Sequence, residues 1–242
     1  MSERSAEAVQ LIVTCEHGGN RIPRPYWPLF KHHQATLASH RGFDPGALSL
    51  ARDVAKHFDA ELIYSTTSRL LVELNRSPNH RQVLSEATRS LSREERQALF
   101  DRYYWPYRNW VESQVEEAIA HRKRVFHLSC HSFTPRMDGV TRNADIGLLY
   151  DPRRARERAL CLEWQERIEA ADRTLKVRRN YPYRGSADGL TTHLRRLHLN
   201  REYAGIEIEV NQKHTMRNPA HWRALRELLV HTLEQVLTRL GK

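Results

Sequence analysis

The stretch LIVTCEHGGNRIP, Leu11 to Pro23, runs from apolar and β-branched residues directly into Glu16 and His17, and then into two glycines. A short apolar run that ends at glycine is typical of a buried strand followed by a sharp turn. Glycines at this point also let a ligand approach the backbone. We therefore expect a core strand whose end presents Glu16 and His17 to a ligand site.

Outward from this strand, short apolar runs alternate with longer amphipathic ones. We expect strands at Val9–Thr14, Glu61–Ser65, Leu70–Leu74, Val125–Cys130, Asp145–Tyr150, Leu175–Arg179 and Ile206–Val210. We expect helices at Pro45–Phe58, Ser92–Arg122, Arg153–Ala171, Asp188–Leu199 and Pro219–Leu240. Strands that alternate with helices predict an α/β fold with a mixed, mostly parallel central sheet between two layers of helices.

Local signals mark where several of these helices begin. Asp44 before Pro45 is a helix start signal, and SREE from Ser92 is a capping-box pattern. Pro106 is expected to kink or split the long helix that follows. We find no internal repeat, low-complexity tract or linker in the sequence, so a single domain is expected over residues 1–242.

The charge of the chain restricts its partners. The net charge is +10, from 39 Lys and Arg against 29 Asp and Glu, which makes nucleic acid the first partner to consider. The positive charge, however, is mostly arginine spread along the whole chain, without a lysine-rich tail or zinc-finger spacing. Arginine suits carboxylates, so we expect a small anionic substrate and no nucleic-acid partner.

The location of the protein is indicated by its cysteines and apolar runs. Cys15, Cys130 and Cys161 form no CxxC pair, and the polar start MSERSAEAVQ has no apolar signal core. No run approaches the roughly 18 apolar residues of a membrane helix. We expect reduced thiols, no membrane span and a cytoplasmic protein. Cys130 is expected to pack in the core, because neighbours on a strand point to opposite faces.

Polar residues at the ends of the expected strands are the candidates for chemistry, because ligands bind at the carboxyl ends of strands in open α/β sheets. The candidates that follow a strand are Glu16, His17, Asn75, Arg76, His131 and Ser132. Glu207 and Glu209 lie within the last expected strand, and Asn211 and Gln212 follow it. Two histidines with one carboxylate are a ligand set of catalytic zinc, which lowers the pKa of its water and polarises a carbonyl group. A further Glu would act as general base, and Glu209 and Glu207 share one face of their strand.

Each candidate also has a structural interpretation. His131 would serve equally as a core histidine, and Glu207 with Glu209 as the solvated face of an edge strand. Asp44 is either a helix cap or the third metal ligand, because both roles need a carboxylate in a fixed position. Asn75 and Arg76 are either a clamp for a substrate carboxylate or ordinary surface residues.

Seven motifs in order resemble those of the N-formylglutamate amidohydrolase family. They are TCEHGGNRIP, HRGFDPGA, SRLLVELNRS, LSCHSFTP, ADIGLLYDP, NYPYRGSADGLTTH and GIEIEVNQ, and they span roughly Leu11 to Gln212. The family is similar to the zinc carboxypeptidases and aspartoacylases. The resemblance implies a three-layer, phosphorylase/hydrolase-like sheet and metal-dependent hydrolysis of the amide of an N-acyl amino acid such as N-formylglutamate.

The resemblance also implies roles for individual residues. His17 and His131 would bind zinc or another divalent metal, and Glu209 would be the general base. Asn75 and Arg76 would hold a substrate carboxylate, whereas Arg69, Arg142 and Arg184 are alternatives for a second one. Asp44 is our expected third metal ligand, with Glu16 as the alternative.

Two departures from the family pattern weaken the substrate assignment. Relatives carry a Glu where this chain has Asn20, so the third ligand must come from elsewhere. Ser129 replaces an Asp that would orient a ligating histidine. A zinc hydrolase acting on another N-acyl amino acid or a short peptide, and a non-catalytic binding protein of the same fold, are therefore the alternative functions.

Overall fold

The computed structural model describes residues 8–240 and contains a six-stranded sheet in the order β2-β1-β3-β8-β6-β7. The strands β1 (Val9–Cys15), β2 (Glu61–Tyr64), β3 (Arg124–Phe133) and β8 (Tyr203–Asn211) run parallel to one another. Strand β6 (Ile146–Leu149) pairs antiparallel with β8, and β7 (Val177–Arg179) pairs parallel with β6. The expected mixed, mostly parallel α/β sheet is confirmed.

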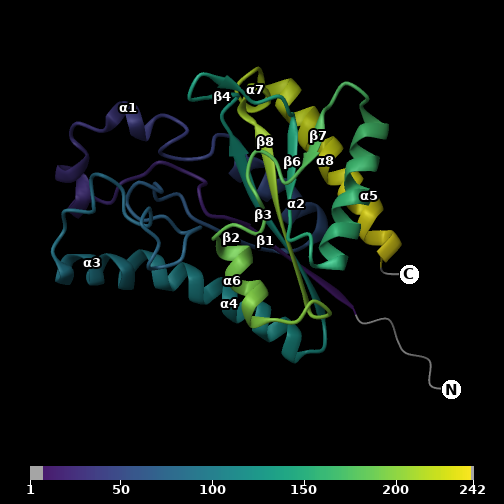
Figure 1. Cartoon of the computed structure of the whole chain (residues 1–242), viewed down its shortest axis with the longest axis horizontal. Helices are drawn as coiled ribbons and strands as arrows, with labels where there is room; N and C mark the ends of the chain where they lie inside the picture. Colours follow the sequence, from purple (N-terminus) through teal and green to yellow (C-terminus); the bar gives the residue numbers. More distant parts are fainter. Residues whose placement is uncertain (1–7, 241–242) are drawn as a thin grey trace.

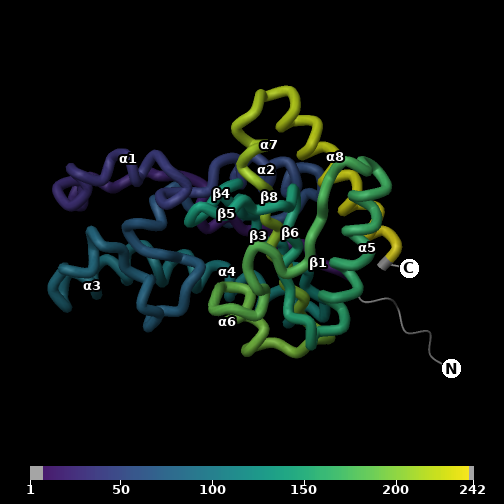
Figure 2. The backbone as a smooth tube through the Cα atoms, turned by 45° about the horizontal axis from the view of Figure 1, so that its top comes forward, coloured from purple at the N-terminus to yellow at the C-terminus, as the bar shows by residue number. Residues whose placement is uncertain are grey.

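Helices lie on both faces of this sheet (Figure 1). The α-helices are α1 (Gln34–Leu37), α2 (Ala47–Phe58), α3 (Arg93–Leu99), α4 (Trp105–Ala120), α5 (Ala155–Ala171), α6 (Leu190–Leu197), α7 (Gln212–Thr215) and α8 (Pro219–Leu240). A 3-10 helix, η1, covers Arg24–Phe30, and a short hairpin is formed by β4 (Arg136–Met137) and β5 (Val140–Thr141). In Figures 1 and 2 the segments that carry α1 and α3 extend from one side of the sheet, opposite α5 and α8.

The alternation of side chains along β1 explains the two helix layers. Val13 is buried in a cluster with residues of α2, α5 and α8, whereas its neighbour Ile12 is buried in a second cluster with residues of α4 and α6. Successive side chains of a strand point to opposite faces, so each face of the sheet carries its own apolar core. Cys130 is buried in the first cluster, as expected.

The long helix predicted from Ser92 is interrupted. Ser92 Oγ accepts from Glu95 N and the Glu95 side chain accepts from Ser92 N, which confirms the capping box. A π-helical turn, η2 (Phe100–Tyr104), separates α3 from α4, and Pro106 stands in the first turn of α4. Proline has no N–H to donate, so the regular α-helical hydrogen bonds give way to a π-helical turn before Pro106, while the chain stays helical from Arg93 to Ala120.

Two predicted strands differ from the structure. Leu70–Leu74 is not a strand: Leu71 N donates to Ser68 O and Glu73 N to Val83 O, as in a folded loop. Its apolar residues are buried against α4 and α6, and burial alone made the run look like a strand. Strand β3 continues to Phe133, so His131 and Ser132 lie within the strand and not after it.

The two glycines after β1 have a different role from the one expected. A Cβ on Gly18 would lie 2.9 Å from Ser65 O, and a Cβ on Gly19 would lie 2.7 Å from Thr66 O. The backbone after β1 therefore packs directly on the segment that follows β2, with Gly18 N donating to Ser65 O at 2.9 Å. The absence of side chains at Gly18 and Gly19 thus makes room for the segment after β2. We had expected it to make room for a ligand.

Within residues 8–240, no helix is long and apolar enough to cross a membrane. All three cysteines are buried and free.

Candidate metal centre and active site

A buried group of two histidines and one aspartate lies at the carboxyl end of the parallel strands. His17 follows β1, Asp44 precedes α2 and His131 lies on β3. Their ligand atoms all lie within 4.8 Å of one another, and this is the one group among residues 8–240 that could hold a metal ion. Asp44 Oδ2 is 3.3 Å from His17 Nδ1 and 2.9 Å from His131 Nδ1. The three side chains therefore point to a common position.

The Nε2 atom of each histidine, which points away from Asp44, contacts a glutamate. His17 Nε2 contacts Glu73 Oε1, and His131 Nε2 lies 3.1 Å from Glu16 Oε2 and 2.9 Å from Ser129 Oγ. A carboxylate at Nε2 accepts the proton of that nitrogen and leaves the lone pair of Nδ1 free for a metal. The geometry therefore favours coordination through Nδ1 at both histidines.

Glu16 lies behind His131 and outside the His-Asp-His group. It is fully buried, accepts from Tyr107 OH at 2.9 Å and from Ser129 Oγ at 2.7 Å. Burial alone would raise the pKa of Glu16, but the hydrogen bond and charge of His131 hold it well below its usual range. Of the two carboxylates that the sequence left open, Asp44 is the one beside both histidines.

Asp44 does not cap helix α2. The N-cap of α2 is Gly46, whose φ is 84°, and no side chain caps this helix. The carboxylate of Asp44 instead faces His17, His131 and Arg69, whose Nη1 donates at 3.2 Å. Burial alone would raise the pKa of Asp44, but the charge of His17 and the hydrogen bond from His131 hold it well below its usual range.

Glu73 is a site residue that the sequence reasoning missed. Its Oε2 accepts from Arg69 Nε at 2.7 Å while Oε1 meets His17, and its side chain is 8% exposed. Burial opposes its ionisation, but the charges of Arg69 and His17 keep its pKa well below the usual range. A signal was present, because Glu73 interrupts the apolar run LLVEL, as Glu207 and Glu209 interrupt theirs.

The ionisation states of His131 and the carboxylates around it also favour a cation at this site. Burial alone would lower the pKa of His131, but its hydrogen bonds to Asp44 and Glu16 raise it well above the usual range. The ionised carboxylates thus require a positive charge at this position. A divalent metal ion bound to Nδ1 would supply two positive charges to these carboxylates, where a proton on His131 supplies one.

Glu207 and Glu209 lie next to this group on β8. His131 pairs with Glu209 in the parallel register of β3 and β8, so both side chains stand on the face covered by α4 and α6. Glu207 Oε1 accepts from Thr191 Oγ1 at 2.6 Å, whereas the buried Oε2 of Glu209 has no hydrogen-bond partner among residues 8–240. Burial, then the charges of Asp44 and Glu207, raise the pKa of Glu209 to about 8 despite the opposing charge of His131.

Asn75 and Arg76 lie on a loop held by neighbouring elements. Asn75 Oδ1 accepts from Leu190 N at 2.7 Å, and Arg76 Nη1 donates to Asp188 O at 2.5 Å. Tyr104 OH also donates to Arg76 O at 2.6 Å. The loop is therefore attached to the start of α6 on one side and to the π-helical turn on the other.

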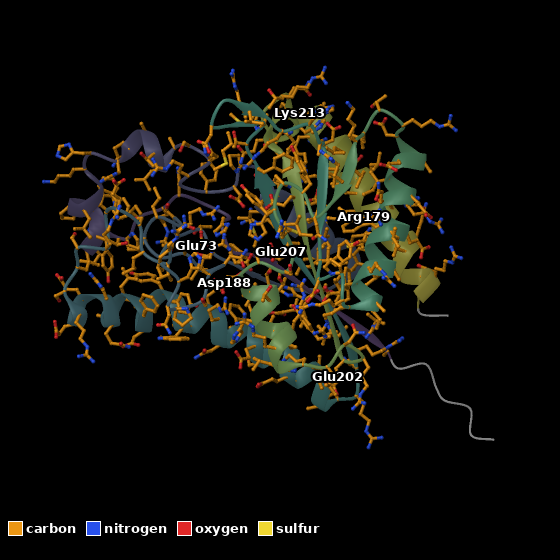
Figure 3. The ribbon with its side chains drawn as sticks, viewed as in Figure 1. Glu73, Arg179, Asp188, Glu202, Glu207 and Lys213 are labelled. Atoms are coloured by element: carbon orange, nitrogen blue, oxygen red, sulfur yellow. The ribbon has the colours of Figure 1, made fainter. Side chains whose placement is uncertain are left out.

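These residues surround a cavity of about 420 Å³, which we call the inner cavity. Its lining includes His17, Asp44, Arg69, Asn75, Arg76, His131, Tyr183, Arg184, Asp188, Glu207 and Glu209. Figure 3 shows Glu207 on β8, with Glu73 and Asp188 toward the side of the sheet that carries α3. Arg142 is not among the lining residues: its guanidinium lies over the rings of Tyr183, at 5.1 Å, and Phe133.

An α/β sheet with a buried His-Asp-His group and a nearby carboxylate in a cavity is the arrangement expected of a hydrolase. A family model described as N-formylglutamate amidohydrolase matches residues 9–216. The chain therefore belongs to the N-formylglutamate amidohydrolase family, and the protein is a hydrolase that acts on an amide. The resemblance found in the seven motifs is confirmed.

Solved structures share this fold over nearly the whole chain. A gene product of Agrobacterium tumefaciens is 28% identical with a TM-score of 0.82, over 99% of this chain and 95% of that one. N-formylglutamate amidohydrolase from Ralstonia eutropha JMP134 is 19% identical with a TM-score of 0.62, over 96% of this chain and 95% of that one. The second likeness shows the fold alone. The comparison with curated proteins found no match.

Proposed function

We propose that the protein is a metal-dependent amidohydrolase that cleaves the amide of an N-formyl amino acid such as N-formylglutamate. The observation that carries this proposal is the convergence of His17 Nδ1, His131 Nδ1 and Asp44 Oδ2 beside the unpaired carboxylate of Glu209 in one cavity. Membership of the family supports the reaction and the substrate class.

The residues of the group fit a zinc ion. Two imidazole nitrogens and one carboxylate oxygen are the donors of many catalytic zinc sites, which keep a position open for water. Each histidine has a carboxylate at its other nitrogen, as metal-binding histidines commonly do. When bound, zinc would lower the pKa of a water molecule and polarise the carbonyl group of the substrate.

Glu209 is our proposed general base. Glu209 lines the inner cavity beside His131, and its buried Oε2 has no competing hydrogen bond among residues 8–240. A bound divalent cation would lower the raised pKa of Glu209. The ionised carboxylate would then take a proton from the water and pass it to the amine nitrogen as the amide C–N bond breaks, so it ends the cycle as it began. Glu207 is a weaker candidate because Thr191 already donates to it.

Arginine and amide groups would hold the carboxylates of the substrate. Arg76 lines the inner cavity and, among residues 8–240, donates only to backbone carbonyl groups, so its guanidinium retains donors for a carboxylate. Asn75 lines the same cavity, with its Nδ2 at 3.4 Å from His131 Nε2. Arg184 lines the same cavity and suits a second carboxylate. Arg69 is already bound to Asp44 and Glu73, so we assign it to positioning these carboxylates.

The direct test combines metal analysis with product detection. Elemental analysis of the purified protein is expected to find a divalent metal that is lost in His17→Ala and Asp44→Asn. Formate release from N-formylglutamate is measured beside N-acetyl amino acids and dipeptides. A metal-free protein with full activity refutes the metal centre, and tight binding of these compounds without turnover indicates a non-catalytic binding protein.

A further inference from the structure

A second, larger hollow adjoins the inner cavity. This outer groove has a volume of about 660 Å³ and shares His40, Arg69, Arg76, Gln82, Met137 and Tyr183 with the inner cavity. Beyond these shared residues it is lined by the loop segments that carry Arg41 and Arg81. The two hollows therefore border each other at Arg69 and Arg76.

The outer groove is larger than a small substrate requires. Pockets of about 300–1,000 Å³ bury whole drug-sized ligands, so the inner cavity alone is sufficient for an N-formyl amino acid. The outer groove thus leaves space for a longer molecule that begins in the inner cavity and continues past Arg76.

The lining of the outer groove carries unbalanced positive charge. Its two carboxylates are already paired, Glu73 with Arg69 and Glu86 with Arg89. Arg76 bonds to backbone carbonyl groups alone, and neither Arg41 nor Arg81 has a carboxylate partner among residues 8–240.

The lowered pKa of His40, which lines both hollows, is consistent with a positive potential in the outer groove. Burial and then the charges of Arg142, Arg41 and Arg69 lower the pKa of His40, and its one opposing influence is Asp44. Guanidinium groups without protein partners at the edge of a cavity favour a carboxylate of a ligand.

We propose that the outer groove binds an additional anionic group of the substrate, held by Arg41 and Arg81 beyond the amide that is cleaved. The preferred substrates are then N-acyl amino acids extended by a carboxylate-bearing segment. This inference rests on the proposed amidohydrolase function and narrows its substrate class. The added carboxylate is carried either on the amine side, as in N-formylglutamylglutamate, or on the acyl side, as in N-succinylglutamate.

The experiment compares each extended substrate with a neutral analogue of the same length. The amine-side pair is N-formylglutamylglutamate and N-formylglutamylglutamine amide, and the acyl-side pair is N-succinylglutamate and N-butyrylglutamate. Each is assayed with the metal-loaded wild type, the double variant Arg41→Ala/Arg81→Ala, and the control Arg223→Ala on α8. Isothermal calorimetry with Glu209→Gln measures the binding of the same compounds without turnover.

We expect one anionic compound to be preferred over its neutral analogue, and the pair in which this occurs identifies the side of the extension. The double variant should lower kcat/KM for that compound about fivefold, as expected for two exposed charge pairs, and leave N-formylglutamate within about twofold. The preference should weaken with added salt. The control Arg223→Ala should change nothing.

Equal kcat/KM and affinity for anionic and neutral compounds, or no effect of the double variant, overturns the outer-groove proposal. Failure of the amidohydrolase function is a different result, because no compound would then be cleaved. The calorimetric comparison still tests the groove in that case.

Discussion

Replacing Glu73 by Gln tests whether the glutamates behind the two histidines control the metal centre. Glu73 contacts Nε2 of His17 through one oxygen and Arg69 through the other. Gln retains an oxygen that accepts from Nε2, but it removes the negative charge that makes Nδ1 of His17 a stronger donor. The expected result is a correctly folded protein that binds zinc more weakly.

The size of the effect follows from these contacts. Loss of such a carboxylate partner typically weakens metal binding about 10- to 100-fold, which corresponds to about 1.4–2.8 kcal/mol. Removing one partner of a buried ion pair costs about 3–5 kcal/mol. Arg69 is 27% exposed and keeps Asp44 as a partner, so we expect a smaller loss of unfolding free energy, about 1–2 kcal/mol.

Competition with a chromophoric chelator measures the zinc affinity of the wild type, Glu73→Gln and Glu16→Gln. The control is Glu202→Gln, because Glu202 lies at the opposite end of β8 from the site (Figure 3). Urea unfolding of the metal-free forms separates stability from affinity. Wild-type zinc affinity in Glu73→Gln, with its fold intact, would refute the reasoning that this carboxylate prepares His17 for the metal.

Three further predictions concern single residues. Glu209→Gln should lower kcat about 10²- to 10⁴-fold without lowering metal content, and an unchanged kcat would exclude Glu209 as the base. Asp145, buried and bonded to His214 at 2.6 Å, has its pKa lowered by this bond against the effect of burial. Its contribution to stability is therefore present above the unfolded pKa, about pH 4, and is lost as the pH falls through the lower folded pKa. In Asp145→Asn, urea titrations from pH 7 to pH 2 should show a weaker dependence of stability on pH, and a wild-type dependence would contradict this. Glu157→Gln leaves the buried Arg195 without its charge partner at 3.0 Å and should cost about 3–5 kcal/mol of unfolding free energy; a loss under about 1 kcal/mol would contradict this.

Local patterns predicted most of the framework. The strands around Val13, Ile146 and Ile208 and the helices from Ser92 and Pro219 all form where apolar periodicity and end signals indicated. The failure at Leu70–Leu74 has a clear cause. Apolar residues of a buried loop satisfy the same burial requirement as those of a buried strand, and only the hydrogen-bond partners distinguish the two.

The sequence by itself determined which residue types were available for the site and the order of the family motifs. The strand pattern and the motifs of the sequence indicate His17, His131, Asp44 and Glu209 as candidates for the site. This was possible because strand identity and motif content are local properties that neighbouring residues encode.

Only the tertiary structure decided what each group faces. The parallel pairing of β1 and β3 brings His17 to His131, 114 residues away, and places Asp44 beside both, with Glu16 behind His131. The tertiary structure also places Glu73 against His17, and it leaves Arg142 outside the lining of the inner cavity. These outcomes depend on strand register and on side-chain direction, which the packing of distant segments fixes and no local pattern contains.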